Sequence, residues 1–300
     1  MRSFFSPGKL LLTSEYVVLD GALALAVPTK WGQEFFVEKI PDGKSRVKWS
    51  ALHQSEPWLE ISLDYGKEEI LTTNIPDSAA FILKLLLHIK QSSPTQLQGN
   101  DSYLMSTNLQ FPPDFGLGSS STLINNLADW AQIDAFHLNE KTLGGSGYDI
   151  AVAQKKSALL YQNVPERIIK PINFDPFFKN ELIFIHLNQK QDSRAGINLY
   201  RSKRKSTELI GQFSALTEKA LEAETLTQFS ELMEAHEQQL SDFLKIKTVQ
   251  ERVFSDCPSF VKSLGAWGGD FVMSSKFSGY QDYFRNAGYG TVFNYTDLII

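Results

Sequence analysis

Apolar and polar residues alternate along much of the first 165 positions, with the two-residue period that is typical of β-strands. This pattern predicts strands at residues 10–19, 22–27, 34–40, 46–51, 58–65, 103–111 and 157–162. The densest apolar run, FILKLLLHI, is far shorter than the ~20 residues of a membrane span and contains Lys84 and His88. We therefore expect a buried helix there, with Asp77 or Ser78 as its N-cap.

The second part of the sequence has a different pattern. A strand-like run, ELIFIHL, precedes a helical region at about 206–255, and a strand, glycine turn and strand are predicted near 265–275. The proline-containing segment KPINFDPFFKN separates the two parts. The chain is thus predicted to be an α+β protein with domains at 1–175 and 176–300.

Composition and charge exclude several classes of function. The 300 residues are 42% hydrophobic, which is enough for substantial cores, and the net charge is −5 with basic residues scattered. The sequence therefore lacks the basic stripe of a nucleic-acid-binding protein. The single cysteine, Cys257, allows no intrachain disulfide, and Pro7, Gly8 and Lys9 interrupt the apolar N-terminus. We expect a cytoplasmic protein that has no membrane partner.

The stretch PPDFGLGSSST, residues 112–122, combines two glycines with four consecutive hydroxyl residues ahead of a helical pattern. Glycines let the backbone approach a ligand closely, and the start of a helix presents unpaired N–H groups and a positive dipole end. This combination predicts a polyphosphate site. A simple helix N-cap is the alternative interpretation of the serines.

Better-known nucleotide motifs do not fit the sequence. Glu38 stands where a Walker A loop ending in Gly43-Lys44-Ser45 would need glycine, and Ser121 stands at the third glycine of the dinucleotide fingerprint. The triplet DFG at 114–116 has no accompanying His-Arg-Asp loop.

Four stretches, in order along nearly the whole chain, resemble motifs of the GHMP kinases, a superfamily that includes galactokinase, homoserine kinase, mevalonate kinase and phosphomevalonate kinase. The first, SPGKLLLTSEY, is similar to the pattern Pro-Gly-Lys-x-x-x-x-Gly-Glu-His/Tyr. PPDFGLGSS resembles the phosphate loop Pro-x-x-x-Gly-Leu-Gly-Ser-Ser, GGSGYDIA the substrate-site motif, and KSLGAWGGDFVM the third motif. The helix-like ELMEAHEQQL precedes that third motif, as in the family.

The resemblance implies a fold and an activity. The expected fold has an N-terminal ribosomal-protein-S5-like domain and a C-terminal ferredoxin-like domain, with ATP and Mg²⁺ between them. The Glu-Tyr pair at 15–16, Ser146-Gly147-x-Asp149 and QKQDSRAGI at 189–197 are most similar to mevalonate and phosphomevalonate kinases. The expected substrate is therefore mevalonate or phosphomevalonate, used to make isoprenoid precursors, and a homodimer is a further expectation. The spelling Gly-Tyr-Asp-Ile-Ala is similar to that of a small GHMP subgroup.

The resemblance also implies a role for individual residues. Asp149 is the expected base for the acceptor's proton, and Lys9 is expected to lower the pKa of that carboxyl and to stabilise the transferred phosphoryl group. Ser120 is the expected Mg²⁺ ligand. Nucleotide binding is assigned to Gly116, Leu117, Gly118, Ser119, Ser120, Ser121, Thr122, Gly268 and Gly269. Substrate binding is assigned to Glu15, Ser146, Gly147, Ser193 and Arg194.

Simpler interpretations remain for several of these residues. Asp149 could be a helix cap, Lys9 a solvated lysine, and Ser193 and Arg194 part of a surface loop without a role. His236 lies in an apolar helical pattern and is expected to be a packed core residue.

Three positions depart from the family pattern. Leu138 stands where mevalonate kinases carry a metal-binding glutamate, with Glu140 out of register; Ser14 replaces a glycine before Glu15; and Trp267 replaces a glycine in the third motif. We expect the Trp267 ring to fill part of the nucleotide cleft. Two alternative functions remain: an enzyme like mevalonate diphosphate decarboxylase, which shares the fold and uses ATP, and a nucleotide-binding relative without catalytic activity, which Leu138 and Trp267 favour.

Overall fold

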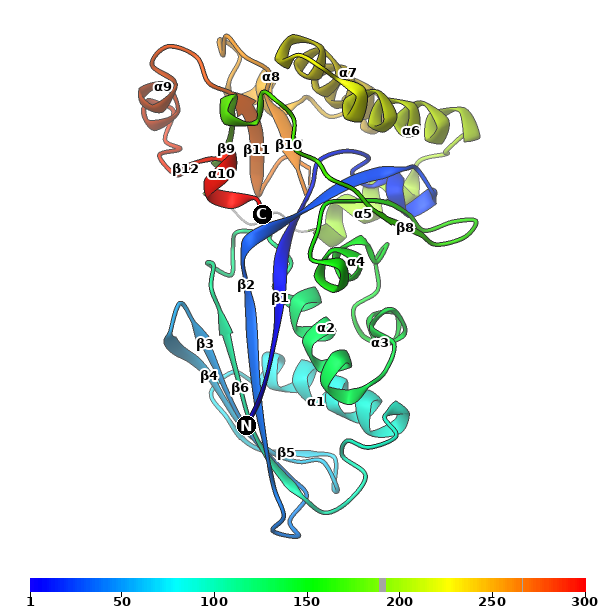
Figure 1. Cartoon of the computed structure of the whole chain (residues 1–300), viewed down its shortest axis with the longest axis vertical. Helices are drawn as coiled ribbons and strands as arrows, with labels where there is room; N and C mark the ends of the chain where they lie inside the picture. The colour runs from blue at the N-terminus through cyan, green and yellow to red at the C-terminus, as the bar shows by residue number, and fades with distance from the viewer. Residues whose placement is uncertain (189–192, 266) are drawn as a thin grey trace. The chain divides into compact units, whose positions relative to one another are not determined.

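The computed structural model describes residues 1–188, 193–265 and 267–300 (Figure 1). The chain forms two compact units, and the segments of each unit are interleaved along the sequence. The first unit contains Met1–Gly8, Trp31–Pro113 and Gly118–Lys156, and the second contains Lys9–Lys30, Asp114–Leu117 and Ser157–Ile300. The predicted boundary near residue 175 rests on composition and stays a prediction.

The first unit is a sheet with helices on one face (Figure 1). Its strands follow the order β5-β4-β3-β6-β2, and only the β3–β6 pair among these neighbours is parallel. The elements that lie in it wholly or in part are β1 (Arg2–Leu11), β2 (Ala24–Ile40), β3 (Arg46–His53), β4 (Glu56–Asp64), β5 (Glu69–Thr73), α1 (Pro76–Ser92), β6 (Ser102–Leu109), α2 (Ser119–Ala131), α3 (Ala135–Thr142) and α4 (Tyr148–Lys155).

Large aromatic side chains fill the core between this sheet and α2. Phe35 of β2 stacks on Trp49 of β3 at a ring distance of 5.8 Å and meets Trp130 of α2 edge-on. Tyr103 of β6 also contacts the edge of Trp130. These contacts fix α2, and with it the serines at its start, against the strands.

The second unit contains a four-stranded antiparallel sheet of order β10-β11-β9-β12. The chain enters these strands in the βαββαβ sequence, which is the ferredoxin-like arrangement. The start of β2 also pairs with β7, and β7 pairs with β8. The remaining elements are η1 (Val17–Asp20), β7 (Leu159–Gln162), β8 (Ile168–Pro171), η2 (Lys179–Glu181), β9 (Leu182–His186), α5 (Ser193–Ser202), α6 (Thr207–Glu222), α7 (Leu226–Leu244), α8 (Val249–Val253), β10 (Lys262–Leu264), β11 (Phe271–Ser275), α9 (Tyr280–Asn286), β12 (Val292–Asn294) and α10 (Tyr295–Leu298).

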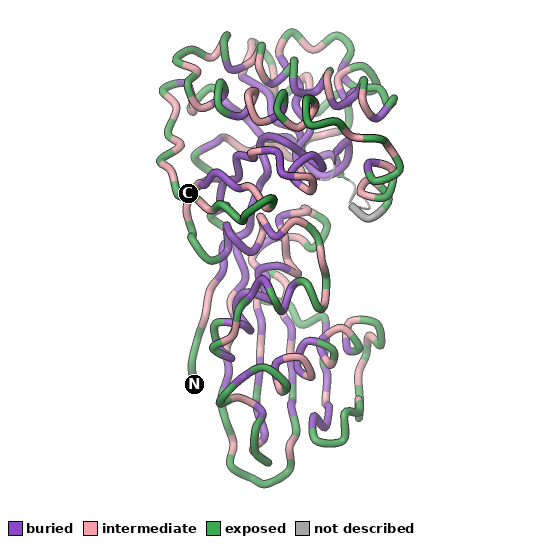
Figure 2. Tube along the Cα trace, turned by 90° about the vertical axis from the view of Figure 1, so that its right-hand side faces the viewer, coloured by how far each residue is buried: buried purple, intermediate pink, exposed green. Residues whose placement is uncertain are grey.

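Buried positions follow the strands and the inner sides of the helices within each unit (Figure 2). In α1 the buried residues are spaced three and four apart, as an amphipathic helix requires. Within the described part of the chain, no helix has both the length and the apolar character needed to cross a bilayer.

Some of the predicted elements differ in the structure. The strand expected at 10–19 ends at Leu11, because the chain turns sharply after Thr13 and continues as the short helix η1. The strands expected at 22–27 and 34–40 form one long strand, β2. Helix α1 begins at Pro76, with Ile75 as its N-cap, so the predicted caps Asp77 and Ser78 are wrong. Proline fits that first helical position because it needs no backbone N–H partner.

Helix α7 begins with a reciprocal capping box. The Thr225 side chain accepts a hydrogen bond from the Gln228 N–H, and the Gln228 side chain accepts from the N-cap backbone. Two N–H groups that the helix leaves unpaired are thereby satisfied. The cap fixes the start of the helix that carries His236 and Glu237.

We expect Thr225→Ala to lower the free energy of unfolding by about 1 kcal/mol, because the Gln228 N–H loses its acceptor. Urea denaturation measures this change. Thr225→Ser, which keeps the hydroxyl, is the matched control and should retain most of the stability. Equal stability of the alanine variant and the native chain would show that the cap contributes nothing.

Candidate functional site

The glycine and serine stretch forms a turn that leads directly into α2. Gly116 and Gly118 have φ values of 67° and 86°, a left-handed conformation that glycine adopts without steric cost. Gly118 is the N-cap residue of α2, and no side-chain hydrogen bond caps this end among the described residues. The serines therefore do not act as the N-cap, and the first turn of α2 keeps its backbone donors for a ligand.

The four hydroxyl residues divide into two pairs. Ser119 and Ser120 are half-buried at the helix start, whereas Ser121 and Thr122 are 5% and 1% exposed. The Thr122 hydroxyl already donates to Gln33 Oε1 at 2.9 Å and lies 2.8 Å from the Ser119 carbonyl oxygen. Thr122 therefore contributes to this end of the helix through its packing rather than through a free hydroxyl.

Asp149 lies in the first turn of α4, next to the first turn of α2. Ser121 Oγ donates to Asp149 Oδ2 at 3.3 Å, which joins the two helix starts. The N-cap of α4 is Gly147, with φ of 87°, so Asp149 is not the cap that the simpler interpretation required. Ser146 and Asp149 are both half-buried. A partly accessible carboxylate therefore stands beside the positive ends of two helices.

Lys9 lies against the phosphate-loop glycines. Its Nζ donates to the Gly116 carbonyl oxygen at 3.1 Å, and its backbone N–H donates to the Leu117 carbonyl oxygen at 3.0 Å. The side chain is only 7% exposed, which excludes the solvated surface lysine. Lys9 thus brings a positive charge to the same loop that leads into α2.

Asp270 is a site residue that the sequence reasoning missed. A Cβ atom at Gly116 would lie 2.2 Å from Asp270 Oδ2, so the carboxylate contacts the phosphate loop where only glycine fits. Asp270 is 6% exposed and directly follows the glycines of the third motif. The sequence feature that could have identified Asp270 is its position directly after Gly268 and Gly269 of the third motif.

The first motif turns sharply around Glu15. Ser14 and Tyr16 have φ values of 64° and 60°, so a non-glycine residue adopts the left-handed conformation on each side. This explains why the related pattern has glycine at position 14. Here the strain at Ser14 is offset by two hydrogen bonds, from its hydroxyl to the Leu23 carbonyl oxygen and from its N–H to His236 Nε2.

Glu15 is fully buried and paired with a lysine of the third motif. Its Oε1 accepts from Lys262 Nζ at 2.7 Å, and Lys262 is also 3.2 Å from Glu237 Oε1. Burial raises the pKa of Glu15 to about 7 against the opposing charge of Lys262, and it also raises the pKa of Glu237. The substrate contact predicted for Glu15 stays a prediction. No spacing of residues along the sequence predicted that Glu15, Lys262 and Glu237 lie together.

Trp267 does not occupy a cleft, contrary to the sequence expectation. Its ring is 5% exposed and packs in the core of the second unit with Tyr16, Tyr200 and Leu240. Its Nε1 donates to Glu237 Oε1 at 2.9 Å. The ring therefore fills space in the core of the second unit, at a position where the related motif has glycine.

The other residues of the third motif are also closely packed. Gly268 has φ of 89°, and a Cβ there would meet the Arg252 guanidinium at 2.8 Å. Gly268 and Gly269 are buried, and their nucleotide contacts stay a prediction. The side chains of Ser193 and Arg194, and the residues 189–192 before them, lie outside the described residues.

Within residues 1–188, 193–265 and 267–300, no carboxylate cage for a metal accompanies Ser120. Leu138 is 2% exposed in α3, and Glu140 on the same helix is exposed. Among the residues that the structure describes, no group of three or more His, Cys, Asp or Glu side chains is placed to hold a metal ion. The half-buried hydroxyl of Ser120 fits a metal that is held mainly by phosphate oxygens.

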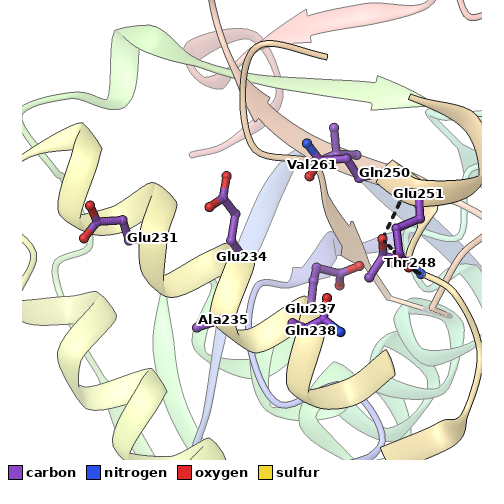
Figure 3. Close-up of a pocket in the computed structure, with 9 residues that line it drawn as sticks. All are labelled: Glu231, Glu234, Ala235, Glu237, Gln238, Thr248, Gln250, Glu251 and Val261. Carbon is purple, nitrogen blue, oxygen red and sulfur yellow. Dashed lines mark hydrogen bonds between the residues drawn. The ribbon is translucent and has the colours of Figure 1, made fainter. Parts of the chain in front are cut away.

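A pocket of about 510 Å³ lies between α7 and α8 (Figure 3). Glu231, Glu234, Glu237 and Glu251 line it, together with glutamine, threonine and aliphatic side chains. Four carboxylates repel a triphosphate, so this pocket is unsuited to a nucleotide.

The chain resembles known structures rather than known sequences. No family model and no curated protein matches it by sequence. The Methanococcus jannaschii mevalonate kinase superposes with a TM-score of 0.68 at 15% identity, over 98% of this chain and 97% of that chain. The Streptococcus pneumoniae phosphomevalonate kinase, in complex with phosphomevalonate and AMPPNP, gives 0.67 at 16% identity, over 96% and 98%. The Lactococcus lactis galactokinase with galactose gives 0.64 at 15% identity, over 95% and 88%.

The chain has the GHMP kinase fold. The predicted α+β fold class, with S5-like and ferredoxin-like parts, is therefore confirmed. These three structural neighbours are kinases of different small molecules, so the shared fold does not assign a substrate to this chain.

We expect Trp267→Ala to lower the free energy of unfolding by about 3–5 kcal/mol, because it empties a buried aromatic site and removes a donor from Glu237. Trp58, which is 42% exposed, provides the control, and Trp58→Ala should change stability by less than about 0.5 kcal/mol. Chemical denaturation of both variants makes the comparison. Equal, small effects would mean that the Trp267 ring is not part of the core.

Proposed function

We propose that the chain is an ATP-dependent small-molecule kinase of GHMP type that phosphorylates mevalonate or phosphomevalonate. The observation that carries the proposal is the arrangement at the start of α2. Two left-handed glycines precede a helix end without a side-chain cap, Lys9 donates to that loop, and Asp149 is hydrogen-bonded to Ser121 in the first turn.

The proposed chemistry needs charge stabilisation at the phosphates and an acceptor for one proton. The N–H groups of the α2 first turn and Lys9 Nζ would bind the negative phosphate oxygens. Asp149 would take the proton from the acceptor hydroxyl as that oxygen forms its bond to the γ-phosphorus and ADP leaves. When bound, Mg²⁺ would neutralise phosphate oxygens, with Ser120 as its ligand from this chain.

The acceptor class rests on the Glu15-Tyr16 pair and on Ser146-Gly147-Tyr148-Asp149, which are similar to the mevalonate and phosphomevalonate kinase motifs. The buried Leu138 favours one competing function, a nucleotide-binding relative without turnover. The cytoplasmic location and the homodimer stay predictions.

A screen for ADP release over mevalonate, phosphomevalonate, homoserine and sugars tests the proposal, with ATP binding measured separately by calorimetry. Turnover with mevalonate or phosphomevalonate is the expected result. ATP binding without turnover on any acceptor would favour the non-catalytic relative. Release of CO₂ would favour a decarboxylase.

We expect Gly118→Val to weaken ATP binding at least tenfold, because a branched side chain at the helix start blocks approach of the phosphates. Gly43→Val is the matched control: Gly43 has φ of 73°, and a Cβ there would meet nothing within 4 Å. Both variants place valine in a left-handed conformation, but only one changes the proposed site. Equal ATP affinities in calorimetry would remove the loop from the nucleotide site.

We expect Asp149→Asn to slow single-turnover phosphoryl transfer by roughly 10² to 10⁴, because asparagine keeps the shape but accepts no proton. ATP affinity and melting temperature should change little. Transfer at a near-native rate would exclude Asp149 as the base. Asp149→Glu is the companion variant, and partial recovery of the rate would separate proton transfer from a local packing defect.

A further inference from the structure

Four ionisable side chains meet in the interior of the second unit, and none of them is given a proton or a phosphoryl group to transfer in the proposed reaction. They are Glu15 of the first-motif turn, His236 and Glu237 of α7, and Lys262 of β10, and each is at most 3% exposed. We refer to these four residues as the buried ionic cluster. The cluster connects Glu15 of the first motif to Lys262 of the third, and its other two members lie on α7, which is part of neither motif.

Lys262 and Glu237 are fully satisfied within the buried ionic cluster. The three N–H bonds of the Lys262 ammonium are directed at Glu15 Oε1, at the Ser263 carbonyl oxygen and, at 3.2 Å, at Glu237 Oε1. Glu237 Oε1 also accepts from Trp267, and Glu237 Oε2 accepts from the Ser263 hydroxyl. A carboxylate with donors on both oxygens is stable in its ionised form.

Glu15 differs from Glu237 at its second oxygen. Within the described part of the chain, Glu15 Oε2 is buried without a hydrogen-bond partner, and it lies 3.4 Å from His236 Nε2. That nitrogen accepts the Ser14 N–H at 2.6 Å, so His236 is neutral and carries its proton on Nδ1. Two acceptor atoms with lone pairs therefore face each other, which is unfavourable as long as Glu15 is ionised.

The net charge of the buried ionic cluster also indicates that a proton on Glu15 is favourable. Two ionised carboxylates and one ammonium leave one uncompensated negative charge among side chains that are at most 3% exposed. A single added proton makes the buried ionic cluster neutral. Among the described residues, Glu15 Oε2 is the carboxylate oxygen in the cluster that lacks a donor, and a proton there removes the repulsion between this oxygen and His236 Nε2.

We propose that the folded protein binds one proton on Glu15 Oε2, beside His236 Nε2, and that this proton holds the first-motif turn against α7 and the third motif. The site goes beyond the proposed kinase function and does not depend on it. Its ligand is a hydrogen ion, and its occupancy changes with pH.

The groups that face Glu15 are Lys262 from β10, His236 and Glu237 from α7, and the neighbouring Tyr16. Burial raises the pKa of Glu15 from 4.5 to about 7, and burial together with Lys262 holds the pKa of His236 well below its usual value. Because the folded pKa of Glu15 exceeds the unfolded one, the proton stabilises the fold fully below about pH 4.5. That stabilisation is lost as the pH rises through about 7.

The pocket of Figure 3 borders the buried ionic cluster. Glu237 lines that pocket and also contacts Lys262 and Trp267. Trp267 joins the cluster to the third motif, and Glu15 joins it to the first.

Infrared difference spectroscopy of the wild-type protein between pH 6 and pH 9 tests the proposal directly. A carboxylic-acid carbonyl band from a buried group should be present at pH 6 and lost by pH 9. The band should be absent in Glu15→Gln and unchanged in Glu234→Gln, whose exposed carboxyl lines the same pocket on α7. A wild-type spectrum without the band at pH 6 overturns the proposal, even if Glu15→Gln fails to fold.

The pH dependence of the melting temperature is the second readout. Wild type and Glu234→Gln should lose stability relative to Glu15→Gln as the pH rises from 6 to 8.5, because glutamine stays neutral throughout. Parallel melting curves for wild type and Glu15→Gln would overturn the assignment. Loss of the infrared band in Glu237→Gln with its retention in Glu15→Gln would place the proton on the other carboxyl and also overturn it.

Discussion

The buried pair of Lys262 and Glu15 is the interaction on which the arrangement of the second unit's motifs depends. Neither side chain is exposed, and each belongs to a different motif, one in the turn after β1 and one in β10. Removing Lys262 would leave the Glu237 carboxylate without its counter-charge in the interior, which typically costs about 3–5 kcal/mol. The pair thus fixes two distant parts of the sequence against each other more strictly than apolar packing alone would.

The glycine loop before α2 is built differently, because its backbone rather than its side chains would supply the contacts of the proposed phosphate site. Left-handed glycines place the loop, and the contact of Asp270 with Gly116 leaves no room for a side chain there. Phe35 and Tyr103 of the sheet pack against Trp130 of α2 and hold the helix in place. A rigid helix with an uncapped start is a suitable anion site because its donors need no rearrangement.

The sequence predicted the fold well where the signal was local or carried by a motif. Alternating apolar residues located most strands of the first unit, and the four ordered motifs led to the correct fold class. The turn at Ser14 was missed because left-handed serine and tyrosine residues have no clear sequence signature. The cap of α1 was missed because Pro76 outweighed the usual capping residues Asp77 and Ser78.

The candidate site was predictable only in part. Lys9 is hydrogen-bonded to Gly116 within the second unit, and Asp149 is hydrogen-bonded to Ser121 within the first, so each contacts a residue of the glycine and serine motif. The pairing of Glu15 with Lys262 spans 247 positions, and no periodicity encodes a contact of that separation. The burial of Trp267 was unpredictable for a similar reason, because the space behind the motif is formed by α7 and by residues near position 16.

The two unusual residues of this chain, Ser14 and Trp267, each form a hydrogen bond with a neighbouring pair on α7. Ser14 donates to His236, and Trp267 donates to Glu237. The backbone N–H of Ser14 and the side chain of Trp267 thus support the same turn of α7, at two positions where the related motifs have glycine. Glycine at position 14 would keep the N–H that His236 accepts, whereas glycine at position 267 would remove the donor to Glu237, so engineering toward the consensus would unpair this turn at Trp267 alone.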